Sequence, residues 1–254
     1  MTTSNNKNGK SILEQIAHRV MLEHGFLPDF SPAVLDELAK IQQVNGGTAP
    51  VIKDLRQLLW ASIDNDDSLD LDQLTVAETL PDNSVKIFVA IADVDALVKK
   101  NSEIDGHAHQ NTTSVYTAGK TFPMLPEKLS TDLTSLNYHE DRLAMVVEMI
   151  IDDAGDIKSS DIYHATVNNH AKLAYNAVAA WLEGKEPAPN KAVAVEPALA
   201  DNLRIQDRVA QKLRSQRYKR GALELQTLET SPVFDGDEIR RLASGGNEPG
   251  QGNH

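Results

Sequence analysis

The sequence predicts an α+β fold, in which a mixed and mostly antiparallel sheet with flanking helices follows a small helical unit. In the first fifty residues, apolar residues recur at helical spacing. From Trp60 onward, short apolar and β-branched runs alternate with turn residues, which is typical of strands. A long helical pattern at 199–219 follows the strands. With 254 residues, the chain can bury a sizeable core in one or two domains.

The helical unit is predicted over residues 11–50, after a polar tail at 1–10 that we expect to be disordered. Its first helix should stop at Gly25, since glycine is the usual residue just past a helix end. Ser31 followed by Pro32 predicts an N-cap and a first helical residue. Gly46 and Gly47 should end the second helix.

The strands are marked by the turns between them. Residues 75–80 and 85–91 flank Pro81, Asp82 and Asn83, so we expect two strands joined by a turn. Residues 143–151 form a continuous apolar strand, and a turn at 153–156 leads into another strand at 157–167.

The C-terminal third is predicted to be mainly helical. Residues 173–182 have a helical pattern, and 184–197 are expected to be a linker because they contain three prolines. The helix at 199–219 should end at Gly221, and residues 241–254 are expected to be a disordered tail.

Composition excludes several classes of protein. A net charge of −12 does not suit a general nucleic-acid binder, although a local basic channel could still admit RNA. Without cysteine, the chain has no disulfide, no thiolate nucleophile and no zinc–cysteine site. No apolar run approaches membrane-spanning length, so we expect a cytoplasmic protein with no membrane partner.

The most informative segment runs from Ser62 to Gln73, because it contains five aspartates: Asp64, Asp66, Asp67, Asp70 and Asp72. Like charges this close repel one another, and a divalent cation can offset the repulsion. The alternative is a solvated acidic loop. Apolar residues between the aspartates favour a partly buried segment, and therefore the metal site.

The spacing of these aspartates excludes an EF-hand calcium loop. Such a loop needs glycine at its sixth position and glutamate at its twelfth. Counted from Asp64, those positions hold Leu69 and Thr75. Magnesium, or manganese in its place, fits the segment better than calcium does.

The acidic segment resembles the aspartate signature of the ribonuclease II/ribonuclease R (RNB) exoribonuclease family. Further motifs of that family follow in the same order and cover about residues 50–240. They lie at residues 89–94, 113–116, 123–130, 133–136, 141–143, 173–175 and 220–223. Several motifs in one order are far more specific than one motif alone. The resemblance implies a partial RNB catalytic domain at 51–240.

The resemblance also implies roles for individual residues. Asp64, Asp70 and Asp72 match family aspartates that hold magnesium at the scissile phosphate and are therefore the candidate catalytic and metal-binding residues. The fourth metal position holds Gln73, a neutral and weaker ligand. Asp67 matches a further acidic position, to which we assign a structural or supporting role.

Tyr116 matches the family tyrosine that stacks on the 3′-terminal base of RNA. An aromatic platform suits sequence-independent binding of a single strand. The alternative is a strand aromatic packed in the core.

Two functions follow from the resemblance. The first is a magnesium-dependent 3′-to-5′ exoribonuclease that hydrolyses single-stranded RNA to nucleoside 5′-monophosphates. The second is a truncated relative that binds metal or RNA, or complements a partner chain, with little or no turnover. The family's later motifs, including an arginine that contacts the phosphate, are absent from this sequence, so we expect little activity from the chain alone.

Other polar clusters are weaker candidates. His107 and His109 lie two residues apart in a helical pattern and are expected to be a solvated pair. A basic cluster at Arg214, Arg217, Lys219 and Arg220 could contact phosphate or simply favour a helix C-terminus.

Overall fold

The computed structural model describes residues 9–41, 51–223, 230–235 and 238–244 of the chain. The chain forms two compact units. The first draws on residues 1–37, 103–125 and 223–254, and the second on residues 38–102 and 126–222. The α+β class predicted from the sequence is confirmed, whereas the predicted domain boundaries stay predictions.

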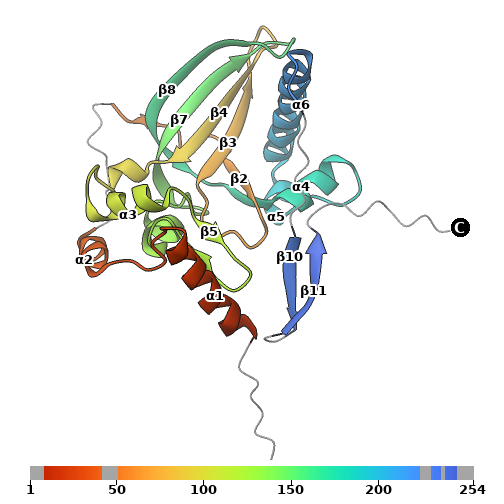
Figure 1. The fold of residues 1–254 in the computed structure, drawn as a ribbon. Helices are drawn as coiled ribbons and strands as arrows, with labels where there is room; N and C mark the ends of the chain where they lie inside the picture. Colours follow the sequence, from red (N-terminus) through yellow and green to blue (C-terminus); the bar gives the residue numbers. More distant parts are fainter. Residues whose placement is uncertain (1–8, 42–50, 224–229, 236–237, 245–254) are drawn as a thin grey trace, which may run out of the picture. The chain divides into compact units, whose positions relative to one another are not determined.

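The second unit contains a seven-stranded sheet in the order β1-β8-β7-β4-β3-β2-β9 (Figure 1). Its strands are β1 (Lys53–Asp54), β2 (Ala61–Asp64), β3 (Gln73–Thr79), β4 (Val85–Ala92), β7 (Asp141–Ile151), β8 (Ile157–Asn168) and β9 (Ala171–Ala174). The β1–β8 and β2–β9 pairs are parallel, and the other neighbours are antiparallel. The sheet is therefore mixed and mostly antiparallel, as predicted.

Turn residues join these strands as the sequence predicts. Between β3 and β4, Asn83 has a φ of 63°, and the Asp82 carboxylate accepts a hydrogen bond from the Ser84 amide at 3.1 Å. Between β7 and β8, Gly155 has a φ of 89°, which glycine adopts at little cost.

Side chains alternate between the two faces of the sheet. On one face Leu74 and Val76 pack with Trp60 and Phe88 in the main core. The other face is covered in part by α6 (Pro197–Lys219), which runs beside β3 (Figure 1). Asn202 of α6 accepts a hydrogen bond from the Ala77 amide at 3.0 Å and donates one to the Ala77 carbonyl at 2.6 Å. These bonds satisfy backbone groups of β3 beyond its short pairing with β2.

Two predictions about the C-terminal third are wrong in part. Leu173 and Ala174, expected in a helix, lie in β9, because parallel pairing with β2 takes up their backbone groups. Helix α4 (Tyr175–Leu182) begins only afterwards. The expected linker contains α5 (Lys191–Val195), which Asn190 caps by accepting a hydrogen bond from the Val193 amide at 2.9 Å.

The second unit also has two short helical turns beside its strands. A 3-10 turn, η1 (Val94–Ala96), follows β4, and a π-helical turn, η2 (Lys128–Leu133), precedes β7. The segment from η2 to β7 lies beside the acidic segment and is important for the site.

The first unit contains most of α2 (Pro32–Lys40) together with α1 (Gly9–Glu23), α3 (Glu103–Asn111), the pair β5 (Val115–Tyr116) and β6 (Thr121–Phe122), and the pair β10 (Thr230–Asp235) and β11 (Glu238–Ser244). Gly25 follows α1 with a φ of 80°, and the Ser31 hydroxyl accepts a hydrogen bond from the Val34 amide at 3.2 Å. Both predicted helix signals are confirmed. Gly46 and Gly47 lie outside the described residues, whereas α1 and β11 each extend into a segment predicted to be a tail.

The solvated pair predicted at His107 and His109 is wrong for His107. Its side chain is buried, with its ring centroid 4.4 Å from that of Phe30. Burial lowers the pKa of His107. Asn111, one turn further along α3, contacts His107 and bonds to the Leu27 backbone, so this face of α3 points inward. His109 is exposed, as predicted.

Within the described part of the chain, no helix is both long enough and apolar enough to cross a membrane.

Candidate active site and metal-binding residues

Asp64 is the last residue of β2, and the residue is 9% exposed. Its Oδ2 atom is buried without a hydrogen-bond partner. A buried carboxylate oxygen without a partner is costly, unless another group, such as a cation, compensates. Burial raises the pKa of Asp64, and the charges of Asp72 and Asp70 raise it further.

Asp70 and Asp72 lie on either side of Leu71, before β3 begins. Leu71 is 3% exposed, whereas Asp72 is exposed and Asp70 half-buried. The pattern of alternating apolar and acidic residues therefore produces the partly buried segment that the sequence predicts. Asp66 and Asp67 are exposed in the loop after β2, so Asp67 is free of the burial that affects Asp64.

The donor chemistry of this segment fits a hard divalent cation. Carboxylate oxygens are the ligands that magnesium and manganese prefer. The unpartnered Asp64 oxygen is the observation in favour of a cation, and the negative charges of Asp70 and Asp72 act on Asp64 in the same sense. Among the described residues, no three histidine or acidic side chains already converge as a metal-binding group.

Lys172 is a neighbour of this site that sequence reasoning missed. It lies on β9, and its Nζ donates a hydrogen bond to the Ser68 carbonyl at 2.6 Å. Its positive charge acts to lower the pKa of Asp64, against the effects of burial and the other aspartates. The motif at residues 173–175 begins one position later, so only the parallel pairing of β9 with β2 reveals this lysine.

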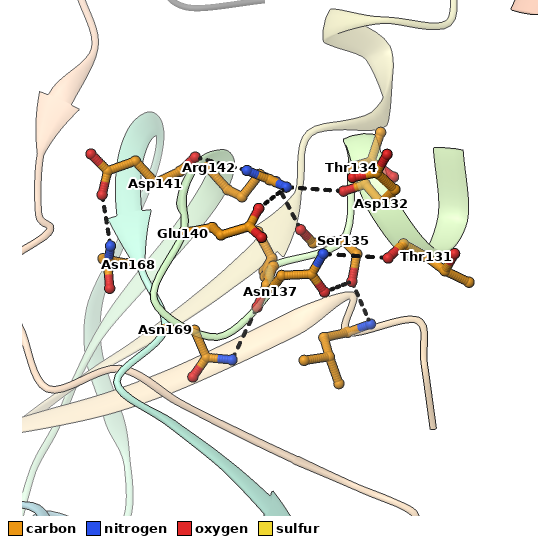
Figure 2. A network of polar contacts seen from close by, with 12 residues as sticks. Thr131, Asp132, Thr134, Ser135, Asn137, Glu140, Asp141, Arg142, Asn168 and Asn169 are labelled. Carbon is orange, nitrogen blue, oxygen red and sulfur yellow. Dashed lines mark hydrogen bonds and ion pairs between the residues drawn. The ribbon is translucent and has the colours of Figure 1, made fainter. Parts of the chain in front are cut away.

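A polar network fixes the backbone of the acidic segment (Figure 2). The Leu71 amide donates to the Ser135 hydroxyl at 3.0 Å, and the Leu136 amide donates to the Leu71 carbonyl at 2.7 Å. Arg142, on β7, donates from Nε to the Ser135 carbonyl at 3.0 Å and forms an ion pair with Glu140. The motifs at 133–136 and 141–143 therefore meet at the acidic segment.

Gln73, predicted as the fourth metal ligand, is exposed at the start of β3. It lines an open cavity of about 610 Å³ together with Ile63, Tyr175 and residues of α6. Asp64, Asp70 and Asp72 do not line this cavity. The described contacts thus do not bring the Gln73 side chain to that of Asp64, and its role as a ligand stays a prediction.

Tyr116 lies in β5 of the first unit and is 72% exposed. It is not a core residue, so the alternative of a buried strand aromatic does not apply. An exposed aromatic ring is the kind of surface on which a base can stack.

The other polar candidates have structural partners. Asp93 caps η1 by accepting from the Ala96 amide and contacts His164 at 3.0 Å. In the basic cluster, Arg220 pairs with Asp156 at 2.8 Å, which supports a role at the C-terminus of α6.

Comparison with known proteins identifies the family. The family model described as the RNB domain matches residues 52–249. Ribonuclease R from Vibrio parahaemolyticus is 39% identical over 184 residues, which cover 72% of this chain and 22% of that protein. Ribonuclease R from Mycoplasma pneumoniae is 34% identical over 232 residues, which cover 89% of this chain and 31% of that protein.

Solved structures agree with these sequence matches. RNase R of Mycoplasma genitalium in complex with ribose-methylated single-stranded RNA matches with a TM-score of 0.83 and 29% identity. The match covers 96% of this chain and 37% of that one. The chain thus spans less than half of the length of these relatives. Its matched segment nevertheless covers most of the chain, and the chain belongs to the RNB domain family.

Proposed function

We propose that this chain carries the metal-binding part of a magnesium-dependent 3′-to-5′ exoribonuclease, which hydrolyses single-stranded RNA to nucleoside 5′-monophosphates. The observation that carries the proposal is the buried, unpartnered Oδ2 of Asp64, beside the charges of Asp70 and Asp72. Solved structures of RNase R from Mycoplasma genitalium are complexes with double-stranded RNA and with ribose-methylated single-stranded RNA, which supports an RNA substrate. A cytoplasmic location is part of this proposal.

In this mechanism Asp64, Asp70 and Asp72 would hold magnesium or manganese. When bound, such an ion would supply positive charge to offset the negative charge that develops on the phosphate during attack by water. Asp64 is held in place by β2, and its raised pKa means that burial disfavours its ionised form, which a bound cation would stabilise. Lys172 offers part of that positive charge from β9.

Tyr116 would bind the terminal base. Its exposed ring can stack on a base of any identity, which suits an enzyme that removes nucleotides one after another. Stacking supplies binding energy and contributes no reacting atom.

A second candidate function is binding of metal or RNA without turnover, or complementation of a partner chain. The neutral Gln73 at the fourth metal position favours it, because an amide holds a divalent ion less firmly than a carboxylate does.

A hybrid enzyme distinguishes these functions. In the hybrid, this chain replaces the matching segment of Ribonuclease R from Vibrio parahaemolyticus, to which it is 39% identical. End-labelled single-stranded RNA and magnesium are then added, and mononucleotide release is followed. The exonuclease proposal predicts release that requires magnesium and that Asp64→Asn abolishes. A folded hybrid that binds RNA without releasing mononucleotides would support the second function.

A further inference from the structure

We propose that Ser135 is a positioning residue for the acidic segment and that it acts through the backbone of Leu71. The inference rests on the proposed function, because it concerns the same metal site. It assigns a role to a residue that would contact neither metal nor RNA.

Leu71 is held through both of its backbone polar groups. Its amide donates to the Ser135 hydroxyl at 3.0 Å, and its carbonyl accepts from the Leu136 amide at 2.7 Å. Both backbone groups of Leu71 are thus bound by two consecutive residues. Since Asp70 and Asp72 are its direct neighbours, the Cα atoms that carry both carboxylates are set by this contact.

Asn137 orients the Ser135 hydroxyl (Figure 2). Ser135 is 1% exposed, and its hydroxyl donates to Asn137 Oδ1 at 2.9 Å. This bond leaves an oxygen lone pair for the Leu71 amide. Asn137 is itself fixed, since its Nδ2 donates to the Thr131 carbonyl at 3.3 Å.

Arg142 fixes the backbone of the segment that contains Ser135. Arg142 is 7% exposed, and it donates to the Ser135 carbonyl at 3.0 Å and to the Asp132 carbonyl at 3.2 Å. Glu140 neutralises its charge. A buried arginine bound in this way fixes the segment before β7, so the Ser135 hydroxyl is presented from a rigid support.

The same network extends to β2, the strand that ends at Asp64. Asn169 is 1% exposed, and its Nδ2 donates to the Leu136 carbonyl at 3.0 Å and to the Ser62 hydroxyl at 3.3 Å. Ser62 lies on β2, two residues before Asp64. One set of buried hydrogen bonds therefore reaches both sides of the acidic segment.

Such a network reduces the ordering that metal binding would otherwise require. Groups that orient metal ligands commonly change metal affinity by about 10–100-fold when they are lost. Ser135→Ala leaves the Leu71 amide buried without its acceptor, so the neighbouring carboxylates lose their fixed positions. Ser135→Thr keeps a hydroxyl at the same place.

The test is manganese binding to the full chain, measured by the loss of the free-ion signal in electron paramagnetic resonance. We expect Ser135→Ala to weaken binding about tenfold, and Ser135→Thr to restore most of it. The matched control is Thr134→Ala. Thr134 is 7% exposed and donates to the Leu129 carbonyl at 2.9 Å without contacting the acidic segment. Its loss should lower thermal stability and leave manganese affinity unchanged.

Hydrogen exchange of the Leu71 amide supplies a readout that needs no metal. Exchange should become faster in Ser135→Ala and stay as in the wild type in Thr134→Ala. Wild-type manganese affinity or unchanged Leu71 exchange in Ser135→Ala would overturn the positioning role, as would an equal loss of affinity in Thr134→Ala. If wild type and Asp64→Asn bind manganese equally, the metal site itself is wrong, and the positioning role falls with it.

Discussion

Asp64 and Asp72 lie on either side of a loop and are coupled through charge. Burial raises the pKa of Asp64, and the carboxylate of Asp72 raises it further. Burial and a neighbouring carboxylate disfavour the charge of Asp64, so a cation at this place would lower the free energy of the folded chain. This coupling supports the assignment of the acidic segment as a metal site.

Asp72→Asn should weaken manganese binding and slow hydrolysis by the hybrid enzyme on the order of a hundredfold or more. The substitution removes one charge at nearly constant shape, so the fold should be kept. Single-turnover cleavage at saturating RNA measures the effect. The exposed Asp66→Asn is the matched control, because it removes the same charge from the same loop and Asp66 has no assigned role. Unchanged hydrolysis in Asp72→Asn would remove Asp72 from the site.

Gln73→Asp should tighten manganese binding if Gln73 is the fourth ligand, since a carboxylate replaces a neutral amide. The alternative is that Gln73 only lines the open cavity that it shares with Ile63 and Tyr175. Calorimetric titration of the wild type and Gln73→Asp with manganese distinguishes a metal ligand from a residue that only lines the cavity. Equal affinities would show that Gln73 belongs to the cavity alone.

Tyr116→Ala should weaken binding of short RNA ends more than it slows the chemical step at saturating substrate. Stacking on one base contributes roughly 1–3 kcal/mol, which is about 5- to 150-fold in affinity. Fluorescence anisotropy with short and long oligonucleotides on the hybrid enzyme measures it. Tyr138→Ala serves as the control, because Tyr138 is also exposed, at 48%, and belongs to the other unit. A loss confined to the chemical rate would contradict the stacking role.

His107 should make the folded state less stable as the pH falls below about 6.5. Burial lowers its pKa, so the unfolded chain binds this proton more readily than the folded chain does. The contribution of His107 to the free energy of unfolding is therefore complete above pH 6.5 and is lost as the pH falls toward the lower pKa of the folded state. The slope cannot exceed about 1.4 kcal/mol per pH unit for one proton.

Urea unfolding between pH 7.5 and 5.5 checks this expectation, with His107→Gln showing a smaller loss of stability than the wild type. His109→Gln changes an exposed histidine on the same helix and should behave like the wild type. A similar pH dependence in His107→Gln and the wild type would show that another group is responsible.

Local signals in the sequence account for much of the fold. Asp82 and Asn83 predict the β3–β4 turn because a short polar side chain bonds to its own backbone and tolerates a positive φ. Gly25 and Ser31 predict the helix ends for similarly local reasons.

The predictions that were wrong depend on distant partners. Leu173 and Ala174 have a helical pattern, but β2 pairs with them across the sheet. His107 follows a polar pattern, yet Phe30 covers it. Tertiary contacts of this kind override local propensity, and spacing along the chain does not reveal them.

The candidate site likewise depends on local signals in part and on distant contacts in part. The aspartates are visible in the sequence because their charges are concentrated in one segment. The Leu71–Ser135 bond joins residues 64 positions apart, so only the folded structure shows why the two motifs occur together.

Thermal unfolding of the wild type and Asp64→Asn at pH 7, with and without manganese, tests the metal site most directly. Without metal, Asp64→Asn should melt at the higher temperature, because it removes a buried carboxylate whose ionised form is disfavoured. With manganese at 100 times its dissociation constant, binding adds about 2.7 kcal/mol, which should raise the wild-type melting temperature by roughly 5 °C or more. Asp64→Asn should gain little, so its advantage in melting temperature over the wild type should shrink or disappear. An equal rise in both proteins would contradict the assignment of Asp64 to a metal site.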